Sequence, residues 1–484
     1  MSARETAAMN DTIIPFHFWD DVPYTRGICL NVTLRFEEVL DTRKLNDSVQ
    51  RLLEIGDWKK LGARLRQDEL GKLEYHLPSE FTKDRPGFIF TTANHATPIS
   101  SHPLASQIPS NQEISQVAVL GCMSSFNSVT KHENTPNGIR EYLTSDIPQL
   151  FIHVVTFTDT TLITVTFLHT LFDAMGLSYF FQAWTAVLSG QEDKVPPFLG
   201  FDEDILEAKT DYVPAEKHVL ASKTFTRFQM AVFILSRWWE TYWYPEIQDK
   251  VISIPNIYVQ KLRENALQEL KTQSPPQCSS SSKDANNFIS EGDILLAYLS
   301  RTLTTALNPP PTTPILISNV FDTRSILNIS QTGAYIGNAT IPSCTSLTAA
   351  TLQTNPLSKT ALALRASLNE QRSPTQVHAM SSLRKKTLQE TGYLPLVGDP
   401  LQISITCTNW HRARFFELDF GSARGDDAHG NGSPSPLGPH VARNLVTVTG
   451  RDGVGNWWVQ ILARASAWGR IEEVVRQLGG DVEI

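Results

Sequence analysis

The segment TVTFLHTLFDAMG contains a histidine and an aspartate whose types and spacing suit general-base chemistry. His169 follows the β-branched run Leu162–Leu168, which predicts a strand, and Asp173 begins a stretch of helical periodicity that continues to Leu188. A histidine at the end of a strand is fixed by the sheet while its ring projects beyond it, and its ordinary pKa of about 6.5 lets it accept a proton. Asp173 is placed to cap the helix or to pair with a cation.

A His-x-x-x-Asp pattern alone is weakly specific, because histidine and aspartate are common enough for chance matches. The structural alternative is a satisfied histidine beside a helix N-terminus. No GxSxG, P-loop, HExxH or strand-linked GxGxxG pattern is present, so the sequence offers no simpler hydrolase, kinase, metalloprotease or dehydrogenase interpretation.

Further segments accompany the histidine in a fixed order. LGARLR and GKLEYHLP occupy Leu61–Pro78, NVFDTRSIL and GAYIGN lie within Asn319–Asn338, and TNWHRARFFELDFG runs from Thr408 to Gly421. Together with HTLFD, this order resembles the BAHD-type (HxxxD) acyl-CoA-dependent acyltransferases, and above all fungal O-acetyltransferases of secondary metabolism. The resemblance covers nearly the whole chain, from IIPFHFWDD at Ile13 to the last predicted strands.

The resemblance implies an α/β protein with the two-domain fold of chloramphenicol acetyltransferase, in which a channel between two mixed sheets receives acyl-CoA and an acceptor. It also implies no permanently bound cofactor, with acetyl-CoA as the expected cosubstrate. The expected reaction is acyl transfer to a hydroxyl of a terpenoid, meroterpenoid or polyketide. His169 matches the catalytic base of the family.

Other site residues are carried over one by one from the family pattern. Asp173 matches an aspartate that pairs with an arginine, for which Arg324 is the candidate, and both are expected to be structural. Thr408 matches a donor to the developing oxyanion, although it could equally be a paired strand threonine. Asp419 and Gly421 begin a structural DFG segment that here continues with Ser-Ala in place of Trp-Gly.

Two clusters have competing interpretations. The basic residues Arg384, Lys385 and Lys386 could contact the phosphates of CoA, or could form a solvated helix face. The aromatic residues at 238, 239 and 242–244 could line an acceptor pocket, but core or interdomain packing is the favoured interpretation.

The predicted elements alternate between strands and helices, which favours two α/β layers. We expect an N-terminal domain at residues 1–200, a crossover linker at 201–245 and a C-terminal domain at 246–484. Predicted elements of the first half include a strand at 28–36, a helix at 42–53 and a hairpin at 150–168. Turn-rich composition predicts loops at 273–287 and 425–440.

Composition excludes several classes of protein. The chain has 484 residues, 41% of them hydrophobic, and a net charge of −8, which argues against a nucleic-acid partner. The five cysteines are scattered without a CxxC pair, so neither a zinc site nor a disulfide framework is indicated. Without a long apolar run or a signal segment, we expect a cytoplasmic protein with no metal and no membrane contact. The family resemblance implies a monomer.

Two rival functions remain open at this stage. One is a condensation-type domain that takes acyl groups from a carrier protein, but these usually have a second histidine before the motif, where this chain has Leu168. The other is a non-catalytic binding protein on the same fold, against which the intact His169 argues.

Overall fold

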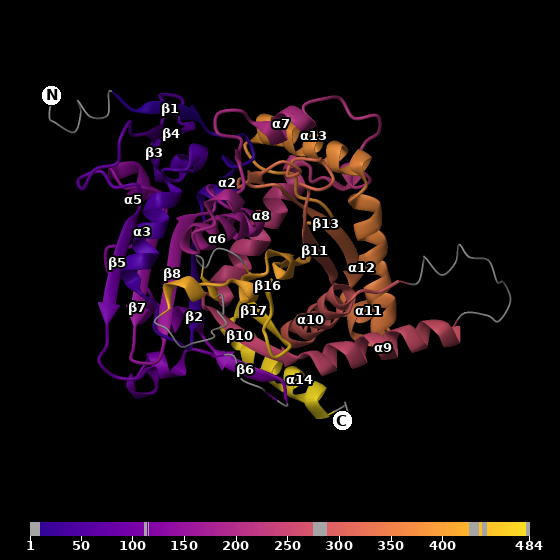
Figure 1. Ribbon diagram of the computed structural model, residues 1–484. Helices are drawn as coiled ribbons and strands as arrows, with labels where there is room; N and C mark the ends of the chain where they lie inside the picture. Colours follow the sequence, from indigo (N-terminus) through magenta and orange to yellow (C-terminus); the bar gives the residue numbers. More distant parts are fainter. Residues whose placement is uncertain are drawn as a thin grey trace.

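The computed structural model describes residues 10–110, 114, 116–273, 288–424, 435–437 and 443–480. Strands in these residues form two large sheets, one mainly from the N-terminal half of the chain and one mainly from the C-terminal half, and helices pack against both (Figure 1). The predicted mixed α/β architecture is therefore confirmed.

The N-terminal sheet has five strands among the described residues. In spatial order they are β15 (Ser435–Leu437), β2 (Cys29–Phe36), β8 (Thr161–Leu168), β7 (Phe151–Thr156) and β5 (Ile89–Asn94). β2, β8 and β7 are antiparallel neighbours, as the predicted hairpin requires, and β5 runs parallel to β7. Every residue of β8 is buried, which explains its nearly continuous run of β-branched and apolar side chains.

Helices α3 (Thr42–Leu52) and α6 (Ala174–Leu188) pack together against this sheet. The predicted apolar stripe of α6 is buried, with Phe180, Phe181 and Trp184 at its centre. Trp184 also donates from Nε1 to Ser48 Oγ of α3 at 2.9 Å. This packing fixes the start of α6, and with it the segment that follows β8.

The C-terminal sheet has seven strands in the described part of the chain. In spatial order they are β13 (Thr340–Thr348), β11 (Pro314–Asp322), β14 (Ile403–Asn409), β16 (Leu445–Arg451), β17 (Asn456–Arg464), β10 (Ile247–Pro255) and β6 (Ala118–Gly121). β11, β14 and β16 are parallel neighbours and the remaining pairs are antiparallel. The longer helices of this half are α9 (Asn256–Gln273), α10 (Glu291–Leu307), α12 (Leu357–Gln371), α13 (Pro374–Thr391) and α14 (Trp468–Gly480).

Each large sheet includes one strand from the other half of the sequence. β6 adds to the edge of the C-terminal sheet beside β10, and β15 adds to the N-terminal sheet beside β2. The division into domains at residues 1–200, 201–245 and 246–484 stays a prediction. β6 and β15 each pair with a sheet on the other side of that division. The expected linker contains α7 (Ile205–Thr210) and α8 (Arg227–Trp243).

The prediction that the aromatic residues of α8 pack in a core is wrong. Trp238 and Trp239 are 76% and 65% exposed, and none of the α8 residues is buried. The half-buried side of the helix faces the protein and already contains the apolar residues Met230, Val232 and Phe233 among its polar ones, so the aromatic side faces outward.

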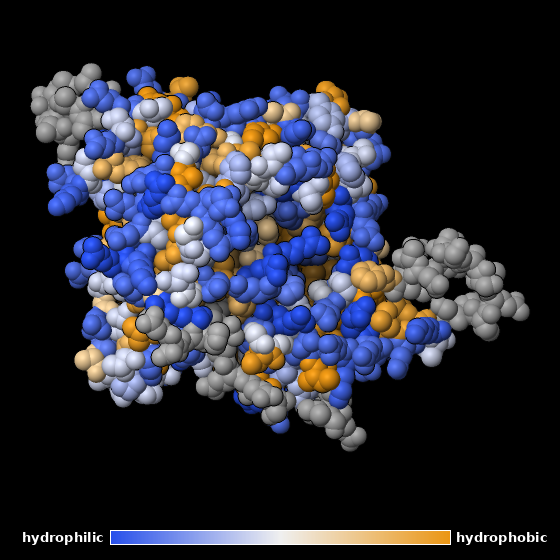
Figure 2. All heavy atoms as spheres, viewed as in Figure 1, coloured by the Kyte–Doolittle hydropathy of each residue, from blue (hydrophilic) through white to orange (hydrophobic). Residues whose placement is uncertain are grey.

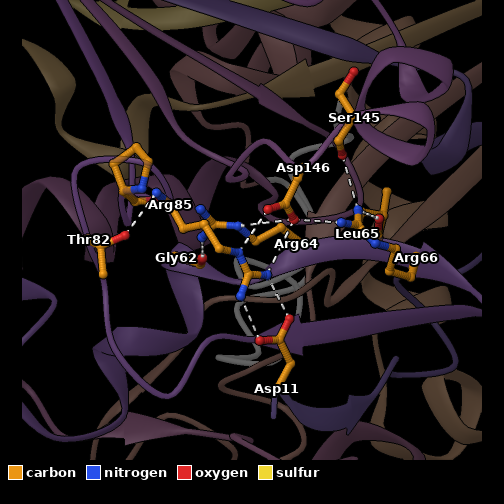
Figure 3. Close-up of polar contacts among 10 residues, drawn as sticks. Asp11, Gly62, Arg64, Leu65, Arg66, Thr82, Arg85, Ser145 and Asp146 are labelled. Carbon is orange, nitrogen blue, oxygen red and sulfur yellow. Dashed lines mark hydrogen bonds and ion pairs between the residues drawn. The ribbon is translucent and has the colours of Figure 1, made fainter. Parts of the chain in front are cut away.

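A small three-stranded sheet, in the order β1 (Thr12–Pro15), β4 (Leu73–Leu77) and β3 (Arg64–Gln67), lies beside the N-terminal sheet. Charged side chains tie it in place (Figure 3). Arg85 donates to both carboxylate oxygens of Asp11 at 2.8 Å and reaches Asp146 at 2.8 Å, where Arg66 also donates at 2.6 Å. These cations are satisfied by carboxylates and serve to hold the sheet.

The remaining elements are short. They are the strand pair β9 (Phe198–Leu199) and β12 (Ala334–Tyr335) and the helices α2 (Pro23–Arg26), α4 (Asn127–Thr130), α5 (Ile139–Thr144) and α11 (Ala349–Thr354). Cys29, Cys122, Cys344 and Cys407 are free thiols. Within the described ranges, no three His, Cys, Asp or Glu residues gather as a metal site, and no helix has the length and apolarity to cross a bilayer. The loop predicted at 273–287 lies outside the described residues beyond Gln273, as does that at 425–440 except for β15.

Candidate active site

A cavity of about 1320 Å³ is lined by residues from both halves of the chain. The N-terminal half contributes Leu30, Phe167 and His169, and the C-terminal half contributes Val320 and Thr408. Figure 2 shows a recess with apolar residues at its bottom in the region where Figure 1 draws β11, β16 and α10. A cavity of this size can hold a drug-sized ligand with room for a second reactant.

His169 lies directly after β8, where its backbone N–H donates to Ile28 O at 2.8 Å and continues the sheet. Its ring lines the cavity. Nδ1 is buried without a hydrogen-bond partner, so Nε2 is the nitrogen available to a molecule in the cavity. Burial lowers the pKa of His169, because desolvation disfavours the imidazolium, and its own carbonyl, Asp173 and Asn338 only partly oppose the shift. The ring is therefore neutral, and able to accept a proton, at pH 7.

The backbone of His169 is held by a residue that the sequence reasoning did not assign. Asn338 donates from Nδ2 to the carbonyl oxygen of His169 at 2.8 Å and to Asp20 Oδ1 at 2.8 Å. Asp20 also accepts from the backbone N–H of Asn338 at 2.6 Å. Burial raises the pKa of Asp20 to about 7, although these bonds from Asn338 favour its ionised form. Asp20 lies in the segment IIPFHFWDD and Asn338 in the segment GAYIGN. These two segments, which carry the family resemblance, were the only sequence features that could have pointed to the two residues.

Asp173 and Arg324 form a buried, two-pronged ion pair. Arg324 donates from Nη1 to Asp173 Oδ2 at 2.9 Å and from Nη2 to Asp173 Oδ1 at 2.8 Å. Asp173 also caps α6 by accepting from Gly176 N at 2.8 Å. Burial alone would lower the pKa of Arg324, but the charges of Asp173 and Asp322 raise it above its ordinary value. The structure thus brings together the two residues that the sequence paired.

Gly176 lies in the first turn of α6, directly against the backbone of Ile336. A Cβ atom at Gly176 would lie 1.9 Å from the carbonyl oxygen of Ile336, so only glycine fits there without moving the backbone. The close approach lets the start of α6 pack on the segment that carries Asn338.

Thr408 lies near the C-terminal end of β14 and lines the cavity. Its hydroxyl oxygen accepts from Trp410 Nε1 at 3.0 Å. Because that bond occupies a lone pair, the hydroxyl proton remains available to a group in the cavity. Trp410 packs against Phe415, which in turn contacts Phe181 of α6.

Asp419 and Gly421 do not line the cavity. Asp419 is exposed and accepts from Gly421 N at 2.7 Å, closing a tight turn. The buried member of the segment is Phe420, which contacts Phe36 and Trp184. The structure thus places this segment in the packing behind α6, away from the cavity.

The three basic residues of α13 have different surroundings. Arg384 lines the cavity and donates to Thr340 O at 3.0 Å. Lys385 forms ion pairs with Glu207 and Asp211, and the exposed Lys386 lies 3.9 Å from Glu390. Of the three, only Arg384 is among the residues around the cavity.

Tyr24 is a second cavity residue that the sequence reasoning missed. Its ring meets that of His169 edge-on, with 5.9 Å between the centroids, and Arg384 lies beside its hydroxyl. Because Tyr24 stands between the base and a cation, it is positioned to shape the space in which an acceptor would lie. No pattern in the sequence around α2 indicated this.

Comparisons with known proteins agree with this geometry. The model of the transferase family matches residues 111–435. Acetyltransferase adrJ of Penicillium roqueforti is 39% identical over 98% of each chain, and O-acyltransferase pboC of Aspergillus ustus is 36% identical over 93% of this chain and 96% of its own. Among solved structures, TRI101 of F. graminearum, complexed with coenzyme A and T-2 mycotoxin, is similar with a TM-score of 0.68 at 13% identity, covering 96% of this chain and 97% of its own.

Two mixed sheets around a shared cavity, with a histidine at the end of a strand, have the chloramphenicol-acetyltransferase-like fold. The chain belongs to the transferase family, whose BAHD-type members its motifs resemble. It is an acyltransferase, as its relatives named acetyltransferase and O-acyltransferase indicate.

Proposed function

We propose that the protein transfers an acetyl group from acetyl-CoA to a hydroxyl of a terpenoid, meroterpenoid or polyketide, with His169 as the general base. The observation that carries the proposal is the position of His169 at the end of β8, where it lines a cavity shared by both halves of the chain. Burial lowers the pKa of this ring, which favours the neutral form that a general base needs. Relatives named acetyltransferase and O-acyltransferase support the acyl group and the oxygen nucleophile.

In the proposed mechanism, Nε2 of His169 takes the proton of the acceptor hydroxyl as its oxygen attacks the thioester carbonyl. The new C–O bond gives a tetrahedral oxyanion. When this intermediate collapses, the C–S bond breaks and the CoA thiolate recovers the proton from the imidazolium. General-base assistance of this kind contributes about 10²–10⁴-fold in rate.

The hydroxyl of Thr408 is the proposed donor to the oxyanion. Trp410 fixes the Thr408 oxygen through a 3.0 Å bond, so the hydroxyl proton is oriented before the reaction begins. A donor held in place costs no reorganisation when charge develops, and its loss costs about 10²–10³-fold in kcat.

Cationic side chains around the cavity could hold the phosphates of CoA. Arg384 stays a candidate, because it lines the cavity. Two further lining residues, Arg372 and Arg412, form no ion pair with the described residues, so their charges are available to a phosphate. Lys385 already has two carboxylate partners.

The test is incubation of the protein with acetyl-CoA and a panel of hydroxylated metabolites, with free thiol and product mass measured together. Thiol release with a product heavier by one acetyl group supports the proposal. Binding of ligand without thiol release would identify a non-catalytic binding protein. Transfer only from an acyl-loaded carrier protein would identify a condensation-type enzyme.

A further inference from the structure

Helix α8 carries a broad apolar surface on its outer side. We call this surface the aromatic arc, and it consists of Phe228, Ile234, Leu235, Trp238, Trp239, Tyr242 and Trp243. Each of these side chains is between 54% and 78% exposed. Exposed apolar patches of this kind mark interaction sites in natural proteins.

Helix α8 carries a wider apolar surface on its outer side than an ordinary surface helix does. At 100° per residue, the aromatic arc spans about half of the helix circumference. On the opposite side Arg237 and Glu240 form an ion pair at 2.7 Å, and Ser236 is half-buried beside them. The half-buried side of the helix mixes these polar residues with Met230, Val232 and Phe233, whereas the outer side is mainly apolar.

The width and composition of the aromatic arc indicate what covers it. A helix that lies in a membrane interface buries an apolar face rich in Trp, Phe and Leu at the boundary of headgroups and acyl chains. Tryptophan and tyrosine are enriched where hydrocarbon meets water, because their rings are apolar and their N–H and O–H groups need a wet partner. Trp238, Trp239 and Tyr242 fit the interfacial layer of a bilayer.

Charge at one end of α8 is complementary to an anionic surface. Lys223 and Arg227 are exposed and form no ion pair with any residue that the structure describes. Cations at a helix N-terminus are unfavourable with respect to the helix dipole, so the helix itself gives no reason for them. Anionic lipid headgroups attract such cations, each contributing modestly to binding.

Both ends of α8 are attached at the rim of the active-site cavity. Phe225 N donates to Leu396 O at 2.8 Å before the helix, and Arg443 donates to Tyr244 O at 2.8 Å after it. Leu396 and Arg443 line the cavity, as does Met230 of α8. One side of α8 thus borders the cavity through Met230, and the aromatic arc on the other side faces the surroundings of the protein.

We propose that the aromatic arc docks the protein on the surface of an anionic lipid bilayer, with α8 lying in the interface. This departs from the expectation that the chain contacts no membrane. Docking in this orientation brings the cavity rim to the lipid surface, where apolar metabolites concentrate. That consequence rests on the proposed function, whereas the docking itself does not.

Vesicle flotation of the full chain tests the proposal without reference to activity. The probes are vesicles of phosphatidylcholine with about 30% phosphatidylserine and vesicles of phosphatidylcholine alone. The unaltered protein should float with the anionic vesicles, and Leu235→Glu/Trp238→Glu should lower the bound fraction at least about tenfold. The matched control is Leu70→Glu, which changes a leucine that is 83% exposed in the β3–β4 turn and should bind like the unaltered protein.

A charge variant separates the electrostatic contribution to vesicle binding from the apolar contribution of the aromatic arc. Lys223→Glu/Arg227→Glu should weaken binding to the anionic vesicles and leave binding to phosphatidylcholine unchanged. If the glutamate variant of the arc fails to fold, Trp238→Ser/Trp239→Ser takes its place. The proposal is overturned if the unaltered protein stays with the buffer, or if sedimentation shows a dimer that the arc variant dissociates while vesicles bind nothing.

Discussion

Helices α6 and α8 are both rich in aromatic residues, but their surroundings are opposite. In α6, Phe180, Phe181 and Trp184 are fully buried between the N-terminal sheet and α3. In α8, Trp238 is 76% exposed, and the half-buried side combines polar residues such as Glu240 with Phe233. The aromatic content of a helix therefore does not decide whether the helix is buried.

The two helices also differ in how they serve the cavity. α6 begins at Asp173, whose carboxylate caps the helix and accepts from Arg324, so the helix is continuous with the network around His169. α8 reaches the cavity with Met230 and is held at its ends. We therefore expect substitutions in α6 to lower the stability of the fold, and substitutions in the aromatic arc of α8 to weaken binding to lipid bilayers.

A matched pair of tryptophan substitutions tests this difference most strongly. Trp184→Ala should lower the free energy of unfolding by about 3–5 kcal/mol, since it empties a packed core and removes the bond to Ser48. Trp238→Ala should change it by less than about 0.5 kcal/mol. Urea unfolding measures both, and equal losses would show that α8 is packed as tightly as α6.

Removal of Arg324 tests the anchor at the start of α6. Arg324→Ala should destabilise the protein by about 3–5 kcal/mol, because it leaves the Asp173 carboxylate buried and unpaired. Lys385→Ala removes a more exposed ion pair and should cost less than about 1 kcal/mol. A fully stable but inactive Arg324→Ala protein would contradict the structural role.

Much of the fold could be predicted from local patterns. The β7–β8 hairpin and α6 were predicted because two neighbouring β-branched runs and one stretch of helical periodicity are visible in single segments. The exchange of β6 and β15 between the sheets could not be predicted, because short edge strands are placed by partners far away in the chain. The outward side of α8 was mispredicted because apolar residues were assumed to face a core.

Thr408 and Met230 both line the cavity, but we expect them to contribute differently to catalysis. Thr408→Val keeps the β-branched shape and removes the hydroxyl, so kcat should fall about 10²–10³-fold if the hydroxyl stabilises the oxyanion. Met230→Ala removes only an apolar contact from α8 and should leave kcat unchanged while raising KM for an apolar acceptor. If Thr408→Val retains full kcat, the residue is a strand threonine alone.

The pH dependence of kcat/KM should reflect the burial of His169. Protonation abolishes the base, so the rate falls as pH falls through the pKa of His169. Because burial lowers this pKa, the midpoint of the acidic limb should lie below about 6.5. An acidic limb centred above that value would show that the ring is more exposed or more strongly paired with Asp173. The Trp238→Ala variant, altered far from this ring, should have the same midpoint.

The site was only partly predictable, and the missing residues share a physical cause. His169, Asp173 and Arg324 could be assigned because their types match a known pattern of chemistry. Asn338 and Asp20 act through a backbone carbonyl, and Tyr24 through the edge of a ring. Such contacts depend on three-dimensional placement, which residue type and spacing do not determine.

The most direct measurement compares thiol release by the unaltered protein and by His169→Ala in single-turnover experiments, with CoA affinity measured by calorimetry. The account predicts a rate about 10²–10⁴-fold lower in the variant, with CoA affinity retained. A variant that folds, binds CoA and still acylates its acceptor at the original rate would show that His169 is not the base.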